Sequence, residues 1–161
     1  MSETVGSTDG MGKRRLPRWV PYFNVIAKPL IALGVPMGPD VLLTVKGRRS
    51  GLPRTTPVTI CEYGGRKGFI SPFGETNWAR NLRAAGIATI RFGRKRVEVR
   101  ATELHHDEAV RFIKEVIIPI AATSKVGDWF VRKMDKVDLD HPDEAVVGMP
   151  VFEVFPDTGL R

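Results

Sequence analysis

The 161-residue sequence has little of what marks several common classes of protein. Its one cysteine, Cys61, excludes an internal disulfide and is typical of a reducing compartment. The three histidines, His105, His106 and His141, do not have the spacing of a zinc site. No apolar run approaches the roughly 20 residues that span a bilayer. Residues 1–12 lack the basic and apolar segments of a signal peptide. These absences predict a cytoplasmic protein with no metal site.

Familiar catalytic and nucleotide-binding motifs are also missing. The sequence has no Gly-x-x-x-x-Gly-Lys loop, no Gly-x-Gly-x-x-Gly after a strand and no Gly-x-Ser-x-Gly elbow. Cys61 lies in a predicted strand, where cysteine is more often a small core residue than a nucleophile. No catalytic residue can be named from the sequence, so we expect any chemistry to belong to a bound cofactor.

The net charge of +7 is unevenly distributed along the chain. Lys and Arg outnumber Asp and Glu by 5 to 0 in residues 10–39 and by 13 to 4 in residues 40–100, whereas residues 101–161 have 7 against 12. A basic region of this kind predicts an anionic partner: a phosphorylated cofactor, an anionic membrane surface or a nucleic acid. Nucleic acid is disfavoured, because the basic residues are not interleaved with exposed aromatics as in known reading modules.

The N-terminal region is predicted to differ from the rest. Residues 1–15 have the composition of a disordered tail with a basic end, and residues 16–161 are predicted to form a single domain. Between Lys13 and Leu33, aromatic and apolar residues at helical spacing are interrupted by three prolines, which predicts short helical pieces packed on the domain. The same basic and aromatic pattern suits peripheral contact with the inner face of the cell membrane, so both interpretations stay open.

From Asp40 onward the pattern is that of strands joined by short turns. Strands are predicted at residues 41–45, 54–60, 68–71, 87–92, 95–104 and 151–155, with helices at 77–85 and 107–118. Parallel neighbours would need crossovers of a dozen residues or more, and the early turns are far shorter. The sequence therefore predicts a mainly β (α+β) fold: a small barrel of about six antiparallel strands with connecting helices and an N-terminal helix.

Three details of this prediction depend on single residues. Pro57 cannot donate to a strand ladder, so its strand is expected to be an edge or to carry a bulge there. Val97, Val99 and Ala101 alternate with charged residues and are expected to face the core. Pro119 is expected to kink or end the long helix.

Two segments could bind an anionic, partly planar ligand. The first is the turn with five polar or basic side chains (Lys46, Arg48, Arg49, Ser50 and Arg54) and two glycines that let the backbone approach closely. The second runs from Ser71 to Trp78, where a strand leads to a helix start that favours anions and where Pro72, Phe73 and Trp78 offer an apolar wall. Each segment also has a simpler structural interpretation. The basic turn could be a hairpin tip that carries charge only for solubility, and Trp78 could simply fill the core under the helix.

Taken together, the two segments resemble the deazaflavin (F420)-dependent nitroreductase family. The resemblance rests on Leu42-Leu43-Thr44-Val45-Lys46-Gly47-Arg48-Arg49-Ser50-Gly51-Leu52-Pro53-Arg54-Thr55-Thr56-Pro57 and on Trp78-Ala79-Arg80-Asn81-Leu82. It implies a split β-barrel of the FMN-binding split-barrel-like kind that binds coenzyme F420, a deazaflavin with a phosphodiester and a tail of γ-linked glutamates. It also implies hydride transfer from the reduced coenzyme to an electron-poor small molecule: a quinone, an activated enone or enoate, or a nitroaromatic.

The resemblance also implies which residues hold the coenzyme. Arg48, Arg49, Ser50 and Arg54, beside Lys46, would hold the phosphate and the tail. The ring would be lined by Thr55, Thr56, Pro57, Val58 and Thr59, and the pocket closed by Ile70, Ser71, Pro72, Phe73, Asn77, Trp78, Ala79, Arg80 and Asn81.

The sequence departs from the family pattern on the substrate side. Pro72 and Phe73 stand where nitroreductases of the family often have a lysine, and the region just before the last strand has no tyrosine, where the family tends to have them. The acceptor is therefore left open, as is the choice between a monomer and a homodimer. Two alternatives to the F420 enzyme remain: an FMN-dependent oxidoreductase on the same barrel, and a basic module that binds anions or lipids without catalysis.

Overall fold

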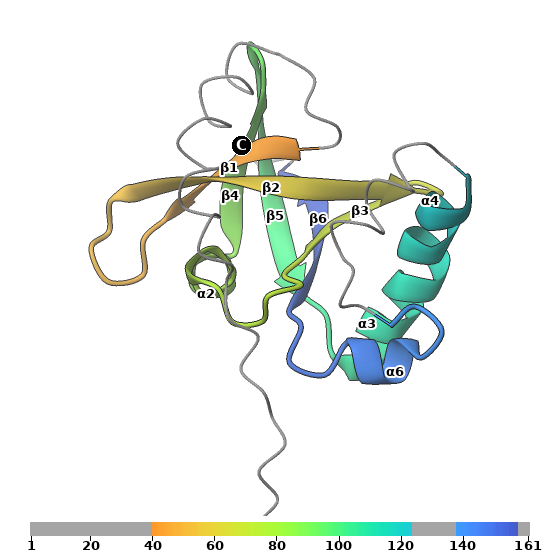
Figure 1. Ribbon diagram of the computed structural model, residues 1–161. Coiled ribbons are helices and arrows are strands. Elements are labelled where there is room, and N and C mark those ends of the chain that lie inside the picture. The colour runs from red at the N-terminus through yellow and green to blue at the C-terminus, as the bar shows by residue number, and fades with distance from the viewer. Residues whose placement is uncertain (1–39, 124–137, 158–161) are drawn as a thin grey trace, which may run out of the picture.

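The computed structural model describes residues 40–123 and 138–157 (Figure 1). The predicted N-terminal tail and helix lie outside this range. The described strands and helices, in chain order, are β1 Asp40–Lys46, β2 Pro53–Tyr63, β3 Arg66–Ile70, α2 Asn77–Ala85, β4 Ile87–Phe92, β5 Lys95–Glu103, α3 His106–Phe112, a π-helical stretch η1 Ile113–Ile117, α4 Ile118–Thr123, α6 Pro142–Ala145 and β6 Val151–Pro156.

The six described strands form a closed barrel in the order β1-β2-β3-β6-β5-β4, and every pair is antiparallel. Closure leaves few strand edges unpaired, which removes the main route to edge-to-edge aggregation. The predicted six-stranded antiparallel barrel with helices in its connections is confirmed. No helix within residues 40–123 and 138–157 combines the length and apolar character needed to cross a membrane.

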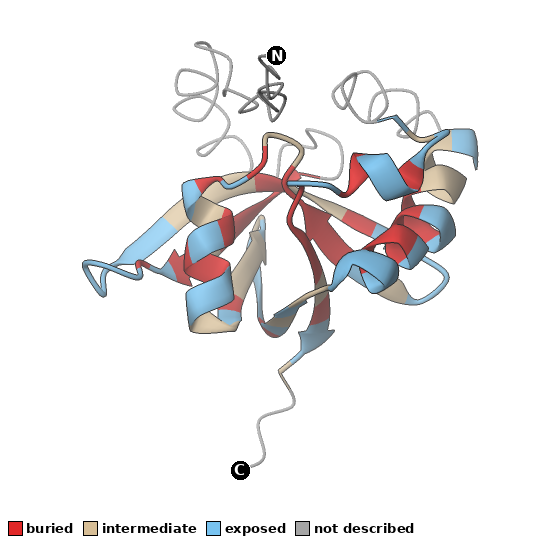
Figure 2. Ribbon diagram, turned by 90° about the horizontal axis from the view of Figure 1, so that it is seen from below, coloured by how far each residue is buried: buried red, intermediate tan, exposed pale blue. Residues whose placement is uncertain are grey.

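Two hydrophobic clusters hold the fold together. One joins barrel side chains such as Leu43, Phe69 and Phe152 to the buried face of α2. The other joins β2, β3 and β6 to the long helical segment through residues such as Phe112 and Val116. The buried surfaces of the helices face the barrel, as Figure 2 shows. α2 is therefore fixed by the barrel core, which matters because it also forms one wall of the candidate site.

Pro57 lies at an edge, as predicted. β2 pairs with β1 from Pro53 to Thr59 but with β3 only from Ile60 to Tyr63, so at Pro57 the strand has a single neighbour. The missing N–H of proline therefore costs the sheet no ladder bond on that side.

Two other predictions were wrong in part. Val97 is 50% exposed, although Val99, two residues on, is buried. The alternation correctly shows that Val97 and Val99 share a face of the strand. Val97 is exposed because β5 extends beyond the end of the barrel and pairs with β6 only from Val99 onward. The long helix continues past Pro119 to Thr123, because the π-helical stretch immediately before the proline changes the hydrogen-bond pattern where a regular helix would clash. The short helix α6 was not predicted.

Candidate functional site

The turn between β1 and β2 owes its shape to two glycines. The N–H of Gly51 donates to Gly47 O and the N–H of Gly47 to Leu52 O, both at 2.8 Å. Gly51 has a φ of 70°, a left-handed conformation that glycine adopts without strain. A β-carbon at Gly47 would lie 2.9 Å from Ser50 Oγ and 3.1 Å from Leu52 O. The turn therefore favours glycine at both positions, through backbone conformation at Gly51 and through close packing at Gly47.

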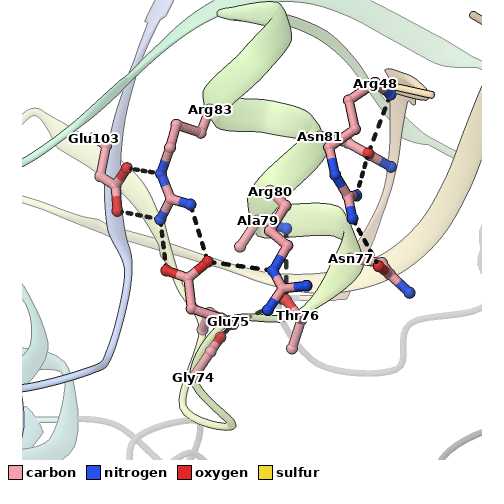
Figure 3. Close-up of polar contacts among 11 residues, drawn as sticks. Arg48, Gly74, Glu75, Thr76, Asn77, Ala79, Arg80, Asn81, Arg83 and Glu103 are labelled. Atoms are coloured by element: carbon pink, nitrogen blue, oxygen red, sulfur yellow. Dashed lines mark hydrogen bonds and ion pairs between the residues drawn. The ribbon is translucent and has the colours of Figure 1, made fainter.

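Arg48 ties this turn to α2 (Figure 3). Its backbone N–H and its Nη1 both donate to Asn81 Oδ1, at 3.2 and 2.8 Å, and its Nη2 lies 3.5 Å from Asn77 Oδ1. Asn81 is only 7% exposed, so the acceptor is held rigidly in the wall of the fold. The guanidinium group of Arg48 is therefore used in positioning the turn.

Arg49 and Arg54 are arranged differently. Both are exposed, and within the described part of the chain neither side chain has a hydrogen-bond or ion-pair partner. The backbone N–H groups of Arg49 and Ser50 are likewise without a partner there, whereas those of Gly47, Arg48, Gly51 and Leu52 are all bonded within the fold. Two guanidinium groups and two N–H groups are thus free to bind an anion.

A cavity of about 600 Å³ lies between this turn, the start of β2 and the N-terminal half of α2. Among the described residues, its lining includes Arg48, Arg49 and Arg54 and no acidic residue. Leu43, Val45 and Trp78 give it an apolar part. A cavity with a strongly basic rim and an apolar wall suits a ligand that is anionic at one end and flat at the other.

The structure brings about half of the predicted site residues to this cavity. Those that line it are Arg48, Arg49, Ser50, Arg54, Thr55, Thr56, Asn77, Trp78 and Asn81. The remaining predicted residues do not line it: Lys46, Pro57, Val58, Thr59, Ile70, Ser71, Pro72, Phe73, Ala79 and Arg80. Sequence reasoning did not include Leu43, Val45, Gly47 and Pro53, which also line it. Leu43 and Val45 alternate along a strand of the quoted motif, and that spacing could have indicated a shared face.

Several of the predicted residues outside the cavity have structural partners. Ser71 is fully buried; its Oγ donates to Gly74 O at 2.6 Å and lies 3.0 Å from Thr76 Oγ1. Ala79 is fully buried on the inner face of α2, and Thr59 Oγ1 donates to Asp40 Oδ1 at 2.6 Å. Lys46 lines a second cavity of about 590 Å³ on the neighbouring surface.

Trp78 fits both interpretations drawn from the sequence. Its ring meets Phe69 edge-on at a centroid distance of 6.3 Å and lies 5.9 Å from the ring of Phe152. It also lines the cavity. One side of the indole therefore completes the core while another part is open to a ligand.

The position of α2 is secured at both ends. The side chain of Thr76 caps its first turn by accepting from the N–H of Ala79, and Gly86 ends it in the left-handed conformation that a glycine C-cap provides. On its outer face Arg83 binds both carboxylate oxygens of Glu75, at 2.6 and 2.9 Å, and also binds Glu103 on β5 (Figure 3). These ion pairs lower the pKa of Glu75.

Cys61 has no access to the cavity and no nucleophilic character. It is 1% exposed in the core between β2 and the long helix. Burial raises the pKa of its thiol, and the nearby charge of Asp40 adds to the effect. The thiol is therefore protonated at neutral pH, as expected of a core residue.

A family model described as F420H(2)-dependent quinone reductase matches residues 31–128 of the chain. Among solved structures, an F420-H2 dependent reductase is 21% identical, with 73% of this chain and 94% of that chain covered and a TM-score of 0.43. A FAD-binding protein from Mesorhizobium loti is 11% identical, with 82% and 88% covered and a TM-score of 0.44. Similarities this distant carry no information about function. No curated protein matches the chain in sequence.

The matched span includes the basic turn, α2 and most of the barrel, so it contains the whole cavity. It covers well over half of the chain and supports the resemblance seen in the two motifs. The chain belongs to the F420H2-dependent quinone reductase family.

Proposed function

We propose that this protein binds coenzyme F420 in the cavity between the β1–β2 turn and α2, and uses it to reduce an electron-poor small molecule. The observation that carries the proposal is the lining of that cavity among the described residues: three arginines, no acidic residue, and an apolar part beside Trp78. F420 has the complementary chemistry, because its phosphodiester and glutamate tail are anionic and its deazaflavin ring is flat.

The free and the bonded arginines have different roles in this proposal. Arg49 and Arg54, with Ser50 and two free N–H groups, bind the phosphate and the tail carboxylates through charge-assisted hydrogen bonds. Arg48 holds the turn against Asn81, so that the binding groups are preorganised. Trp78 and Val45 pack against the ring and exclude water from it.

When bound, the reduced coenzyme would supply a hydride to an acceptor such as a quinone, an activated enone or enoate, or a nitroaromatic. The cavity's lining within the described residues has only Arg, Ser, Thr and Asn as polar side chains, with no carboxylic acid, histidine, tyrosine, lysine or thiol among them. We therefore assign the proton that completes the reduction to solvent, and the polar side chains to hydrogen bonds with the developing negative charge.

Separate titrations with F420 and FMN test the proposal. F420 is expected to bind more tightly, since the basic rim is matched to a longer polyanion. Arg54→Ala is expected to weaken F420 binding by about one to two powers of ten, the loss of a charge-assisted hydrogen bond. Arg111→Ala is the matched control, because Arg111 is an exposed arginine on α3 that does not line the cavity. Preferential FMN binding, or equal affinities in Arg54→Ala and Arg111→Ala, would contradict the proposal.

A further inference from the structure

The tip of the β4–β5 hairpin, residues 91–98, projects beyond the barrel. β4 pairs with β1 only as far as Arg91, and β5 pairs with β6 only from Val99 onward. The tip is therefore a two-stranded ribbon closed by Gly93 and Arg94, and in Figure 1 it rises at the top of the view, away from α3 and α6. Isolated ribbons of this kind gain little from packing, so the side chains at the tip need another explanation.

One face of the tip is apolar and exposed. Phe92 and Val97 lie on the same face of the hairpin as Ala88 and Val99, which are buried in the barrel. Beyond the barrel end the apolar side chains of the same face are about half exposed, Phe92 at 45% and Val97 at 50%. Two large apolar side chains are thus carried to the outermost part of the fold.

Cations lie on both faces of the tip: Lys95 is opposite Phe92 and on its face, whereas Arg91 and Arg96 are on the other face. Residues 91–98 contain Arg91, Arg94, Lys95 and Arg96 and one acid, Glu98. Arg91 and Arg96 are directly opposite each other across the hairpin, an arrangement of like charges that destabilises a sheet. Arg94, Lys95 and Arg96 have no acidic partner within the described part of the chain.

A hairpin tip with exposed apolar side chains on one face, and with cations in its turn and on both faces, suits the surface of an anionic bilayer. The apolar side chains can enter the boundary between headgroups and acyl chains while the cations contact lipid phosphates. We propose that the β4–β5 tip is a peripheral docking surface for anionic lipid membranes, inserting Phe92 and Val97 between headgroups bound by Arg94, Lys95 and Arg96.

The proposal does not depend on coenzyme binding, and its test uses the full chain without coenzyme. Binding is measured by co-sedimentation with vesicles of phosphatidylcholine mixed with phosphatidylglycerol, and with phosphatidylcholine alone. Each cation near an anionic surface contributes about fivefold in affinity. The double variant Arg94→Ala/Arg96→Ala should therefore bind the mixed vesicles roughly 25-fold more weakly. Arg111→Ala/Lys114→Ala removes the same charge from the outer face of the long helix and should bind like the parent chain.

Insertion has its own readout. Phe92→Trp places a fluorophore at an exposed position that tolerates it. Its emission, taken as the difference from the parent chain, should shift to shorter wavelength on the mixed vesicles and be quenched by brominated acyl chains. Three results would overturn the proposal. The parent chain could bind phosphatidylcholine vesicles as tightly as the mixed vesicles, the two double variants could bind the mixed vesicles equally, or the emission of Phe92→Trp could stay unchanged when mixed vesicles are added. Retardation of a duplex nucleic acid that depends on Arg94 and Arg96, without vesicle binding, would overturn it in favour of another partner.

Discussion

Asn81→Ala separates the positioning role of Arg48 from direct contact with the coenzyme. The substitution removes the oxygen that accepts from both Arg48 N and Arg48 Nη1, while leaving Arg49 and Arg54 in place. A charge-assisted bond contributes about 1.5–3 kcal/mol and a neutral one about 0.5–1.5 kcal/mol. Because the pair is only partly buried, we expect a loss of about 2 kcal/mol in the free energy of unfolding.

That loss should be measurable by two assays on the same protein. At 2–4 °C per kcal/mol for a chain of this size, the midpoint of thermal unfolding should fall by about 4–8 °C. If the bonds between Arg48 and Asn81 preorganise the turn, F420 affinity should also fall. Their loss removes about 2 kcal/mol of positioning energy, so the affinity can fall by at most roughly 30-fold, which is the same energy expressed as a ratio of dissociation constants. Arg54→Ala should show the opposite balance: a large loss of affinity with an almost unchanged melting temperature.

Asn77→Ala is the matched control, because Asn77 also faces Arg48 from α2 but at the long distance of 3.5 Å. It should melt nearly as the parent does; because Asn77 itself lines the cavity, it is a control for the stability measurement and not for the affinity. The reasoning is refuted if Asn81→Ala melts with the parent and binds F420 equally well. It is also refuted if Arg54→Ala loses as much stability as Asn81→Ala, since Arg54 would then belong to the fold.

Three further outcomes are expected. Gly68→Ala should destabilise the barrel by about 1–3 kcal/mol in denaturant titrations, because its β-carbon would lie 2.3 Å from Phe152 O; an unchanged midpoint would contradict this packing. Arg83 lowers the pKa of Glu75 below its ordinary 4.5, so the stability from this pair is present above pH 4.5 and is lost as the pH falls through the lower folded value. Glu75→Gln should therefore flatten that part of the curve of stability against pH. A curve identical to that of the parent would contradict a contribution of this ion pair to stability. Glu153→Gln should lower the melting temperature, since Arg66 donates to both of its oxygens at 2.7 and 2.9 Å; an equal melting temperature would show that the pair adds nothing.

Local patterns predicted the barrel and the helix of the site. Period-two alternation, helical spacing and short turns with glycine are all properties of neighbouring residues, so they can be read along the chain. Pro57 was placed at an edge because its missing N–H is a property of the residue itself. The same local reasoning could not show where the barrel ends, and therefore misplaced Val97.

The role of Arg48 needed the structure. Its partner Asn81 is 33 residues away, and no local spacing relates a turn residue to a helix residue at that distance. The sequence therefore grouped Arg48 with Arg49 and Arg54 as equivalent cations. The structure shows Arg48 bonded within the fold, and Arg49 and Arg54 without a partner among the described residues.

The most direct test of the proposed coenzyme site compares two ligands in two proteins. The ligands are F420 and the same deazaflavin without the phosphodiester and glutamate tail, and the proteins are the parent chain and Arg54→Ala. If Arg54 binds the anionic part of the coenzyme, the substitution should weaken F420 by about one to two powers of ten and leave the shortened ligand unaffected. Equal losses for both ligands, or no loss for either, would contradict the assignment of this cavity to the coenzyme.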